Sequence, residues 1–418
     1  MKQALILCGG KAKRLRPYSY SLPKASFPFL NLPLLSFAWF YLEQLKVSHF
    51  LLNSHLFPEK LKNTVRSLSQ AHQRTNLFFE EEPLGSAGTL YQLKKDLQKT
   101  EDFVYINGDS LFFPSHKDHI NSFEEMFFNA GLSALFFVIP YKDIGSKKAL
   151  WCDRDLNLKF VGSKEDLAHC KWSHLTPFTW TGLALFKSSL LDSLKEKAFD
   201  LFQDFINPLL KMQRIKVYVD SSAVLLEAGD KASYLKSSKF CLDCLFQAGE
   251  PSKSLECNGE QNKTTRNQLK EKDLVEESNK FGLSGLNVSA APVNPSALVI
   301  PAKAGIHLSA QNSNEVKKKA VKSILESCFN RFDPSDEKVG LKNGKTLSQK
   351  LGYPLLLPKS VRGLDFLKLQ GSAVIGSEVC FLEDSVLEDC VLDSQIAFKG
   401  QLKKNLLLKT KLYLPNIQ

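Results

Sequence analysis

MKQALILCGGKAKRLRPYSYSLPK, residues 1–24, begins with a short apolar run from Ala4 to Leu7 that ends at Cys8-Gly9-Gly10 and is followed by cations. An apolar run of this kind, ended by glycines, predicts a buried parallel strand that leads into a tight loop. Glycines lack side chains, so the loop backbone can approach a ligand and present its N–H groups. Arg14 and Lys24 can reach phosphate oxygens as fixed cations. On these residues alone, a triphosphate-binding loop and a charged surface turn both remain open.

Length and composition limit the remaining interpretations. The chain has 418 residues, which suggests two or three domains, and its 43% hydrophobic residues and 30 Phe suffice for a large core. The net charge of +11 suits nucleic acid, an anionic membrane surface or a phosphorylated substrate. Because no long Lys/Arg run or nucleic-acid module occurs, we favour a small phosphorylated ligand, with no nucleic acid or membrane as partner. For most of the lysines, a solvated surface remains the alternative.

The nine cysteines form an odd set without a disulfide framework and fit a reducing cytoplasm, so we expect a cytoplasmic protein. Cys241 and Cys244 form a CxxC pair, but no second pair or His set stands at metal spacing, which favours packed thiols. The apolar core after Lys2-Gln3 is about five residues, below the ~7–15 of a signal peptide. No run approaches the ~18–20 apolar residues of a membrane helix.

Strand-like and helical segments alternate through the first part of the chain. Strands are predicted at 4–7, 50–53, 77–79 and 102–106, with helices at 34–47, 58–71 and 89–97 between them. This alternation predicts an α/β fold with a doubly wound sheet, whose ligands bind beyond the strand C-termini. The polar and glycine-rich motifs, among them Asn107-Gly108-Asp109, all follow such strands.

The composition divides the chain into three parts. Residues 1–245 contain the α/β pattern, which continues with strands at 132–140 and 178–186 and an irregular region around 151–164. An amphipathic segment at 199–212, helical until Pro208, and a helix at 231–245 follow. Residues 246–350 are polar and predict a linker or insert, partly disordered, with one helix near 314–329. Residues 351–418 repeat leucines every five residues from Leu382, which suits a parallel β-solenoid, with a meander of short strands as the alternative.

Several segments together resemble the sugar-1-phosphate nucleotidyltransferases. The N-terminal stretch is similar to their L-x-G-G-x-G-T-R-L-x-P…P-K loop, and Glu82-Pro83-Leu84-Gly85-Ser86-Ala87-Gly88 is similar to their E-x-L-G-T-A-G loop. Asn107-Gly108-Asp109 resembles the strand end that supplies a magnesium ligand, 178–186 the sugar-site strand, and 225–235 the closing W-x-D-x-G-T…Y-L element. The C-terminal repeats resemble the left-handed β-helix of the mannose-1-phosphate guanylyltransferases.

The resemblance implies a Rossmann-like mixed sheet, the nucleotide-diphospho-sugar transferase fold, with a small C-terminal left-handed parallel β-helix-like domain. It implies attack of a sugar 1-phosphate on the α-phosphorus of an NTP, with GTP or UTP favoured, in the manner of a mannose-1-phosphate guanylyltransferase. A homo-oligomer is left open. The implied residues are catalytic Arg14 and Lys24; nucleotide-binding Leu7, Gly9, Gly10, Glu82, Gly85 and Gly88; sugar-phosphate Lys164 and Gly182; and, for Mg²⁺, Asp109 and Glu227.

The sequence also departs from the family pattern. Ala12 and Lys13 replace Gly-Thr, and because alanine adopts positive φ less readily, we expect a shifted loop. Leu225 replaces the usual Trp, Glu227 replaces the second metal-binding Asp, and the E-K-P motif has no clear copy, Lys164 being the nearest candidate. These departures support an alternative, a regulatory or sensing relative that binds nucleotide-sugar without turnover. An acyltransferase using the solenoid is disfavoured, because no His follows His307.

Overall fold

The computed structural model describes residues 2–70, 73–141, 148–168, 174–246 and 310–332, and the short strands β14–β22 between residues 355 and 407. The chain divides into two compact units, residues 1–248 with 310–418 and residues 249–309. The second unit lies outside the described residues, as does most of the predicted polar insert.

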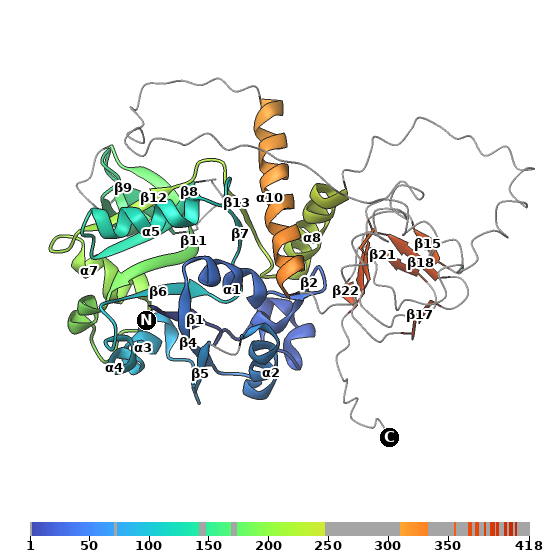
Figure 1. Cartoon of the computed structure of the whole chain (residues 1–418), viewed down its shortest axis with the longest axis horizontal. Helices are drawn as coiled ribbons and strands as arrows, with labels where there is room; N and C mark the ends of the chain where they lie inside the picture. Colours follow the sequence, from blue (N-terminus) through green and yellow to red (C-terminus); the bar gives the residue numbers. More distant parts are fainter. Residues whose placement is uncertain are drawn as a thin grey trace, which may run out of the picture. The chain divides into compact units, whose positions relative to one another are not determined.

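A mixed sheet forms the centre of the first unit (Figure 1). Its strands are β1 (Lys2–Leu7), β4 (Val47–Ser54), β5 (Arg74–Phe79), β6 (Asp102–Asn107), β8 (Ala134–Pro140), β9 (Ala149–Cys152), β10 (Leu158–Gly162), β11 (Thr176–Lys187) and β12 (Ile215–Val219). Their order is β10-β9-β11-β6-β1-β4-β5, with β8 paired to β11 and β12 paired to β8. Strands β1, β4, β5 and β6 are parallel, whereas β11 runs antiparallel to β6 and β8. The predicted mixed α/β sheet is confirmed.

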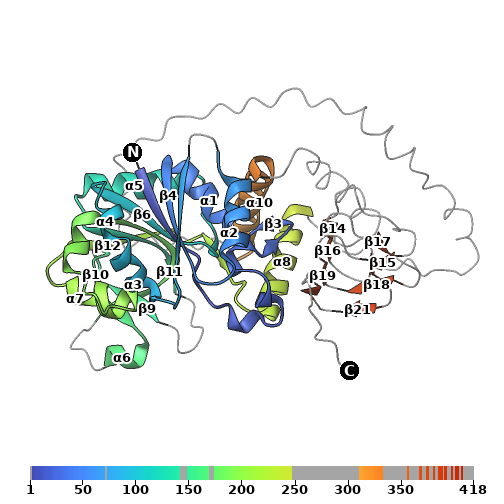
Figure 2. The same cartoon turned by 90° about the horizontal axis from the view of Figure 1, so that it is seen from below.

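Both faces of the sheet are covered, as the apolar strand sequences predict. Ala4 and Ile6 of β1 point into one hydrophobic core and Leu5 into the other. The first core takes side chains from α1 (Leu35–Gln44), α2 (Pro58–Leu68), α5 (His119–Asn129), α8 (Lys231–Phe246) and α10 (Ala310–Phe332). The second takes them from α3 (Gly85–Gln92), α4 (Lys94–Leu97) and α7 (Asn207–Leu209). Figure 2 shows α1, α2, α8 and α10 on one side of the sheet and α3, α4 and α7 on the other.

Helix α10, predicted near 314–329, packs against α8 and α1. Val321, Leu325 and Cys328 are fully buried in the first core. The Arg331 guanidinium donates from Nε and Nη2 to the two carboxylate oxygens of Glu43, at 2.8 and 2.6 Å. A helix from within the predicted insert therefore completes the core of the N-terminal domain. Within the described ranges, no helix is both long and apolar enough to cross a membrane.

The cysteine pair of α8 is packed, as predicted. Cys241 and Cys244 are buried free thiols, and burial raises the pKa of the Cys244 thiol to about 12. The described residues contain no group of three or more side chains suited to hold a metal ion.

Two predicted regions differ in the structure. The segment expected to be helical from 199 until Pro208 is helical, but as a π-helix, η5 (Leu201–Ile206), followed by α7. The Asp200 carboxylate caps its start by accepting hydrogen bonds from the N–H groups of Phe202 and Gln203. The region expected to be irregular contains the antiparallel pair β9–β10 and the short helix α6 (Lys164–Ala168). Trp151 ties this pair together by donating to the Gly162 carbonyl at 3.0 Å.

Short elements frame the C-terminal edge of the sheet. They are the 3-10 turns η1 (Lys13–Leu15), η2 (Tyr18–Tyr20) and η3 (Lys24–Ser26), the pair β2 (Pro28–Phe29) and β3 (Leu32–Pro33), and the pair β7 (Leu111–Phe113) and β13 (Val224–Leu226). The turn η4 (Ser188–Ser193) follows β11 at the opposite edge, where Lys187 pairs with Asp102. The β7–β13 ladder is antiparallel and pairs Leu226 with Leu111.

The C-terminal strands pair in parallel in three ladders, β14-β16-β19-β22, β15-β18-β21 and β17-β20. Partners lie 15 to 18 positions apart, as in Val391–Leu406 and Leu355–Ala373. An offset of 15 to 18 residues divided among the three ladders is five to six residues for each, which is close to the five-residue leucine spacing. The strands are β14 (Leu355–Leu356), β15 (Leu367–Leu369), β16 (Ala373–Ile375), β17 (Cys380–Phe381), β18 (Ser385–Glu388), β19 (Cys390–Leu392), β20 (Ala397–Phe398), β21 (Gln401–Lys403) and β22 (Leu406–Leu407).

Candidate functional site

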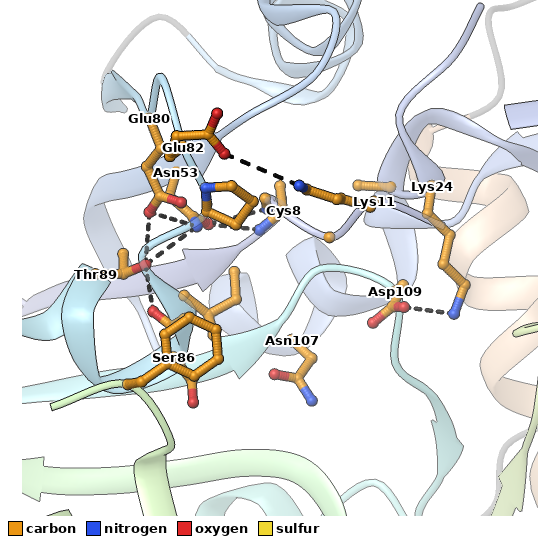
Figure 3. A pocket seen from close by; sticks show the side chains of 17 residues that line it. Cys8, Lys11, Lys24, Asn53, Glu80, Glu82, Ser86, Thr89, Asn107 and Asp109 are labelled. Atoms are coloured by element: carbon orange, nitrogen blue, oxygen red, sulfur yellow. Dashed lines mark hydrogen bonds and ion pairs between the residues drawn. The ribbon is translucent and has the colours of Figure 1, made fainter. Parts of the chain in front are cut away.

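A cavity of about 620 Å³ lies beyond the C-terminal ends of β1, β4, β5 and β6 (Figure 3). Much of its wall comes from the loop after β1, which we call the glycine loop (residues 8–16), from η3, from the loop 82–88 and from the end of β6. The lining residues are Leu7, Cys8, Gly9, Gly10, Lys11, Lys24, Ala25, Asn53, Glu80, Glu82, Pro83, Gly85, Ser86, Thr89, Asn107, Asp109 and Phe199.

The glycine loop is anchored by Asn53, the residue just before the end of β4. The Asn53 side-chain carbonyl accepts hydrogen bonds from the N–H groups of Cys8 and Gly9, at 2.7 and 3.3 Å. A Cβ on Gly9 would lie 2.5 Å from Asn53 Nδ2, whereas a Cβ on Gly10 would meet nothing within 4 Å. Gly9 is therefore required for packing, and Gly10 leaves its backbone exposed to the cavity.

These two glycines should respond differently to alanine. We expect Gly9→Ala to lower the free energy of unfolding by about 1–3 kcal/mol, because the added methyl overlaps the Asn53 amide. Gly10→Ala should leave it within about 0.5 kcal/mol of the wild-type value. Urea denaturation of the two variants checks this; equal stabilities would contradict the packing role of Gly9.

Asn53 also connects the glycine loop to a buried carboxylate. Its Nδ2 donates to Glu80 Oε1 at 2.9 Å, and Thr89 Oγ1 donates to the same oxygen at 2.6 Å. The other Glu80 oxygen accepts from Leu84 N–H at 3.3 Å. Glu80 is only 3% exposed, so these donors replace its water shell. Asn53, Glu80 and Thr89 join the β1 loop, the end of β5 and helix α3 into one network.

Ala12 holds the glycine loop in a left-handed conformation, with φ 45° and ψ 36°. The loop thus has a backbone that glycine adopts more easily, and its turn is closed by hydrogen bonds from Leu15 N–H and Ser19 Oγ to the Ala12 carbonyl, both 3.0 Å. Alanine therefore occupies the left-handed region that we expected it to avoid.

Replacing Ala12 with glycine should stabilise the protein. The left-handed conformation costs a residue with a Cβ roughly 1–2 kcal/mol, and glycine removes this cost. Glycine also loses more backbone entropy on folding than alanine, which opposes the gain by roughly 0.5–1 kcal/mol. We expect a net gain of about 0.5–1 kcal/mol in the free energy of unfolding. The matched control is Ala232→Gly, in the exposed first turn of α8, which should lose stability. Urea denaturation of both variants checks the signs, and a destabilised Ala12→Gly would contradict them.

An ion pair lies at the opposite wall of the cavity. Lys24 Nζ and Asp109 Oδ2 are 2.5 Å apart, and both side chains are partly exposed to the cavity. Cys8 lies buried nearby, and its burial, together with the Asp109 charge, raises the pKa of its thiol, which is therefore neutral. The charged groups of this wall are the ammonium and the carboxylate.

The β7–β13 ladder brings the two predicted metal ligands to one end. The antiparallel ladder ends at the Leu226–Leu111 pair, so Glu227 follows β13 and Asp109 precedes β7 at the same end of the ladder. Asp109 and Glu227 are partly or fully exposed carboxylates, the hard oxygen ligands that Mg²⁺ prefers. Mg²⁺ commonly uses one or two protein carboxylates together with substrate phosphates, so this pair fits the ion.

Five predicted site residues do not line the cavity. Arg14 is exposed and lies against the loop before α8, where a Cβ on Gly229 would be 2.8 Å from its Nη2. Lys164 is exposed at the start of α6, and Glu227 is exposed at the end of β13. The remaining two are Gly88, inside α3, and Gly182, in β11.

Gly182 has φ +97°, and a Cβ there would lie 2.1 Å from Ser110 Oγ and 3.1 Å from Asn107 Nδ2. Side chains at and after the end of β6 thus approach Gly182 closely. In contrast, Leu7, Gly9, Gly10, Lys24, Glu82, Gly85 and Asp109 of the predicted set all line one cavity.

Comparisons with known proteins agree with this arrangement. Residues 3–148 match the family model described as nucleotidyl transferase. The chain is 29% identical over 244 residues to D-glycero-alpha-D-manno-heptose 1-phosphate guanylyltransferase of Aneurinibacillus thermoaerophilus, covering 57% of this chain and 97% of that protein. It is 35% identical over 109 residues to the mannose-1-phosphate guanylyltransferase catalytic subunit beta of Danio rerio, covering 26% and 30%.

Among solved structures, HddC from Yersinia pseudotuberculosis is 20% identical, with a TM-score of 0.46, over 57% of this chain and 98% of that one. The family match and the curated relatives, taken with the motifs in the cavity, confirm the resemblance seen in the sequence. Residues 3–148 thus resemble a nucleotidyl transferase domain, and the findings support a place for the chain among the sugar-1-phosphate nucleotidyltransferases.

Proposed function

We propose that this protein transfers a guanylyl group from GTP to a mannose-type sugar 1-phosphate and releases pyrophosphate. The general reaction, nucleotidyl transfer to a sugar 1-phosphate, is that of the family. The choice of guanine and of a mannose-type sugar is supported by the names of the curated relatives, which act on heptose and mannose 1-phosphates. UTP is the second nucleotide to test.

The observation that carries the proposal is the polarity of the cavity. The Lys24–Asp109 ion pair lies at one end and the 82–88 loop forms the other (Figure 3). The glycine loop lies between them, with Lys11 Nζ 4.0 Å from Glu82 Oε2. A volume of about 620 Å³ is within the range of roughly 300–1,000 Å³ of small-molecule sites. A nucleoside triphosphate has the same division into a polyanionic end and a planar end.

In the proposed reaction, an oxygen of the sugar 1-phosphate attacks the α-phosphorus. The bond from that phosphorus to the oxygen that bridges to the β-phosphate breaks, and pyrophosphate leaves. The chain needs no side-chain nucleophile, because its task is to hold two polyanions in line and to neutralise charge. The N–H groups of the glycine loop and the Lys24 ammonium would bind phosphate oxygens, and Arg14 would reach the triphosphate from η1.

Asp109 and Glu227 would hold Mg²⁺. When bound, this ion neutralises phosphate charge and fixes the orientation of the phosphate oxygens. We assign the sugar phosphate to the side of Gly182 and Lys164, of which Gly182 contacts the residues at the end of β6. The parallel ladders of residues 355–407 would form the proposed left-handed β-solenoid.

The test combines each of GTP, UTP, ATP, CTP and dTTP with mannose, glucose, heptose and N-acetylated sugar 1-phosphates in the presence of Mg²⁺. Pyrophosphate release is the readout, and we expect the highest kcat/KM with GTP and a mannose-type sugar. If pyrophosphate were released only with a different nucleotide or a different sugar, the proposed substrates would be wrong and the reaction class would stand. Nucleotide binding without pyrophosphate from any combination would overturn the catalytic proposal in favour of the sensing relative.

A further inference from the structure

Phe199 is an aromatic residue of the cavity wall. The proposed reaction assigns it no role. It follows η4 and precedes η5, and it lines the cavity together with Pro83, Gly85 and Ser86. Its side chain is 59% exposed, one of the few large apolar side chains in the described residues with so much accessible surface. An aromatic ring left open inside a ligand-sized cavity provides an apolar surface that a ligand can cover.

The backbone around Phe199 is fixed by hydrogen bonds to the 82–88 loop. The Phe199 carbonyl accepts from Ala87 N–H at 3.0 Å, and Leu201 N–H donates to Ser86 Oγ at 2.9 Å. On the other side, the N–H groups of Phe199 and Asp200 donate to the Asp204 carboxylate, both at 2.8 Å. The ring is therefore carried on a segment that is held at both ends.

Gly85 lies directly beneath this ring. A Cβ on Gly85 would be 2.4 Å from the Phe199 carbonyl oxygen and 2.7 Å from its Cγ and Cδ2, and Gly85 has φ +74°. Only glycine combines this backbone conformation with so close a neighbour. The loop and the ring thus form one surface, because the absence of a side chain at Gly85 leaves room for the Phe199 ring.

This surface lies away from the phosphate-binding groups. In Figure 3, Ser86 and Glu82 of the 82–88 loop are on one side of the cavity, whereas Lys24 and Asp109 are on the other. A ligand whose phosphates reach the Lys24–Asp109 wall would extend its uncharged end toward Gly85 and Phe199.

We propose that the Phe199 ring stacks on the nucleobase of the bound nucleoside triphosphate, an inference that rests on the proposed function. Every nucleobase has a flat π-face, so stacking strengthens binding without distinguishing bases. Phe199 is accordingly a positioning residue for the nucleotide, which places the α-phosphate relative to Lys24 and Asp109. The sugar 1-phosphate has no aromatic face, and its affinity does not depend on Phe199.

The experiment measures dissociation constants of GTP and of inorganic tripolyphosphate by calorimetry for the wild type, Phe199→Ala and Phe199→Trp. We expect Phe199→Ala to weaken GTP binding about tenfold or more and to leave tripolyphosphate binding within about twofold, whereas Phe199→Trp retains GTP affinity. Phe128→Ala on α5, which removes another exposed phenyl ring (43%) outside the cavity, is the matched control and should change neither value.

Two outcomes would overturn the inference alone: unchanged GTP affinity in Phe199→Ala, or an equal loss for GTP and tripolyphosphate. The latter would show that the variant disturbs the phosphate wall instead of removing a base contact. The wild-type measurement reports separately on the proposed function, because a wild type that binds no nucleoside triphosphate overturns that function and the inference with it. We expect equal KM values for the sugar 1-phosphate in wild type and Phe199→Ala, which would show that Phe199 contacts the nucleotide and not the sugar 1-phosphate.

Discussion

Asp109→Asn is expected to lower the kcat/KM of pyrophosphate release by about 10²–10³-fold, with little change in folding stability. Asparagine preserves the shape of the side chain but removes the charge that we assign to Mg²⁺. It also leaves Lys24 without its ion-pair partner, which is 2.5 Å away in the structure. The measurements are steady-state kinetics and the binding of Mn²⁺, used as a paramagnetic substitute for Mg²⁺, to the protein with and without nucleotide.

Lys24→Met provides the complementary variant, because the two partners of the ion pair should have opposite effects on metal binding. In the free protein the Lys24 ammonium neutralises Asp109 and competes with a divalent cation for the same oxygens. Removing it should strengthen Mn²⁺ binding to the free protein by about tenfold, although catalysis still falls because a phosphate-binding cation is lost. Asp109→Asn should instead weaken Mn²⁺ binding.

The assignment of this wall would be refuted if Asp109→Asn retained near wild-type kcat/KM. If both variants changed Mn²⁺ affinity in the same direction, the competition between Lys24 and the metal would be refuted, while the catalytic role of Asp109 would stand.

Asn53→Ala should lower the free energy of unfolding by about 3 kcal/mol. The substitution removes the acceptor for Cys8 N–H and Gly9 N–H and one donor to the buried Glu80 carboxylate. A buried polar group left without a partner costs roughly 1–3 kcal/mol, and more when it is charged. Thr89 and Leu84 N–H continue to donate to Glu80, which limits the loss. Urea denaturation followed by circular dichroism measures the change.

Asn76→Ala is the matched control for this prediction. Asn76 lies in the neighbouring strand β5 and is exposed, so its substitution should change the free energy of unfolding by less than about 0.5 kcal/mol. A loss below about 1 kcal/mol in Asn53→Ala would mean that water replaces the amide and that the network does not fix the glycine loop.

Much of the fold could be predicted because its central strands are continuous apolar runs. The runs Ala4–Leu7 and Asp102–Ile106 predicted the buried strands β1 and β6, and each strand ends at a glycine-containing turn. Strands β9 and β10 escaped prediction, because they are short runs flanked by charged residues such as Lys148 and Asp153, and their pairing joins two segments whose contact the sequence does not reveal. The amphipathic pattern of 199–212 predicted a helix that begins at Phe199, whereas the Asp200 carboxylate caps a helix that begins at Leu201.

The predictable part of the site consists of residues that are close together in the sequence. The glycine loop and the 82–88 loop are short motifs, and Asp109 follows an apolar strand. Asn53, Glu80 and Thr89 were not predicted as site residues, since they lie far apart in the sequence. The parallel register of β1, β4 and β5, with α3 packed after β5, brings them together. The exposure of Phe199 likewise depends on the fold, because nothing in the sequence distinguishes it from the other 29 Phe.

The burial of α10 in the first core has a consequence for the order of synthesis. Val321, Leu325 and Cys328 fill the surface of α1 and α8, yet they are translated long after Phe246, where α8 ends. At about 5–20 residues per second, the ribosome needs roughly 4 to 17 s to proceed from that residue to the end of α10. During this interval the nascent domain presents an apolar face to chaperones and to other unfolded chains. A truncated chain that ends at residue 246 would keep that face permanently open, so the choice of expression boundary decides the yield of folded protein.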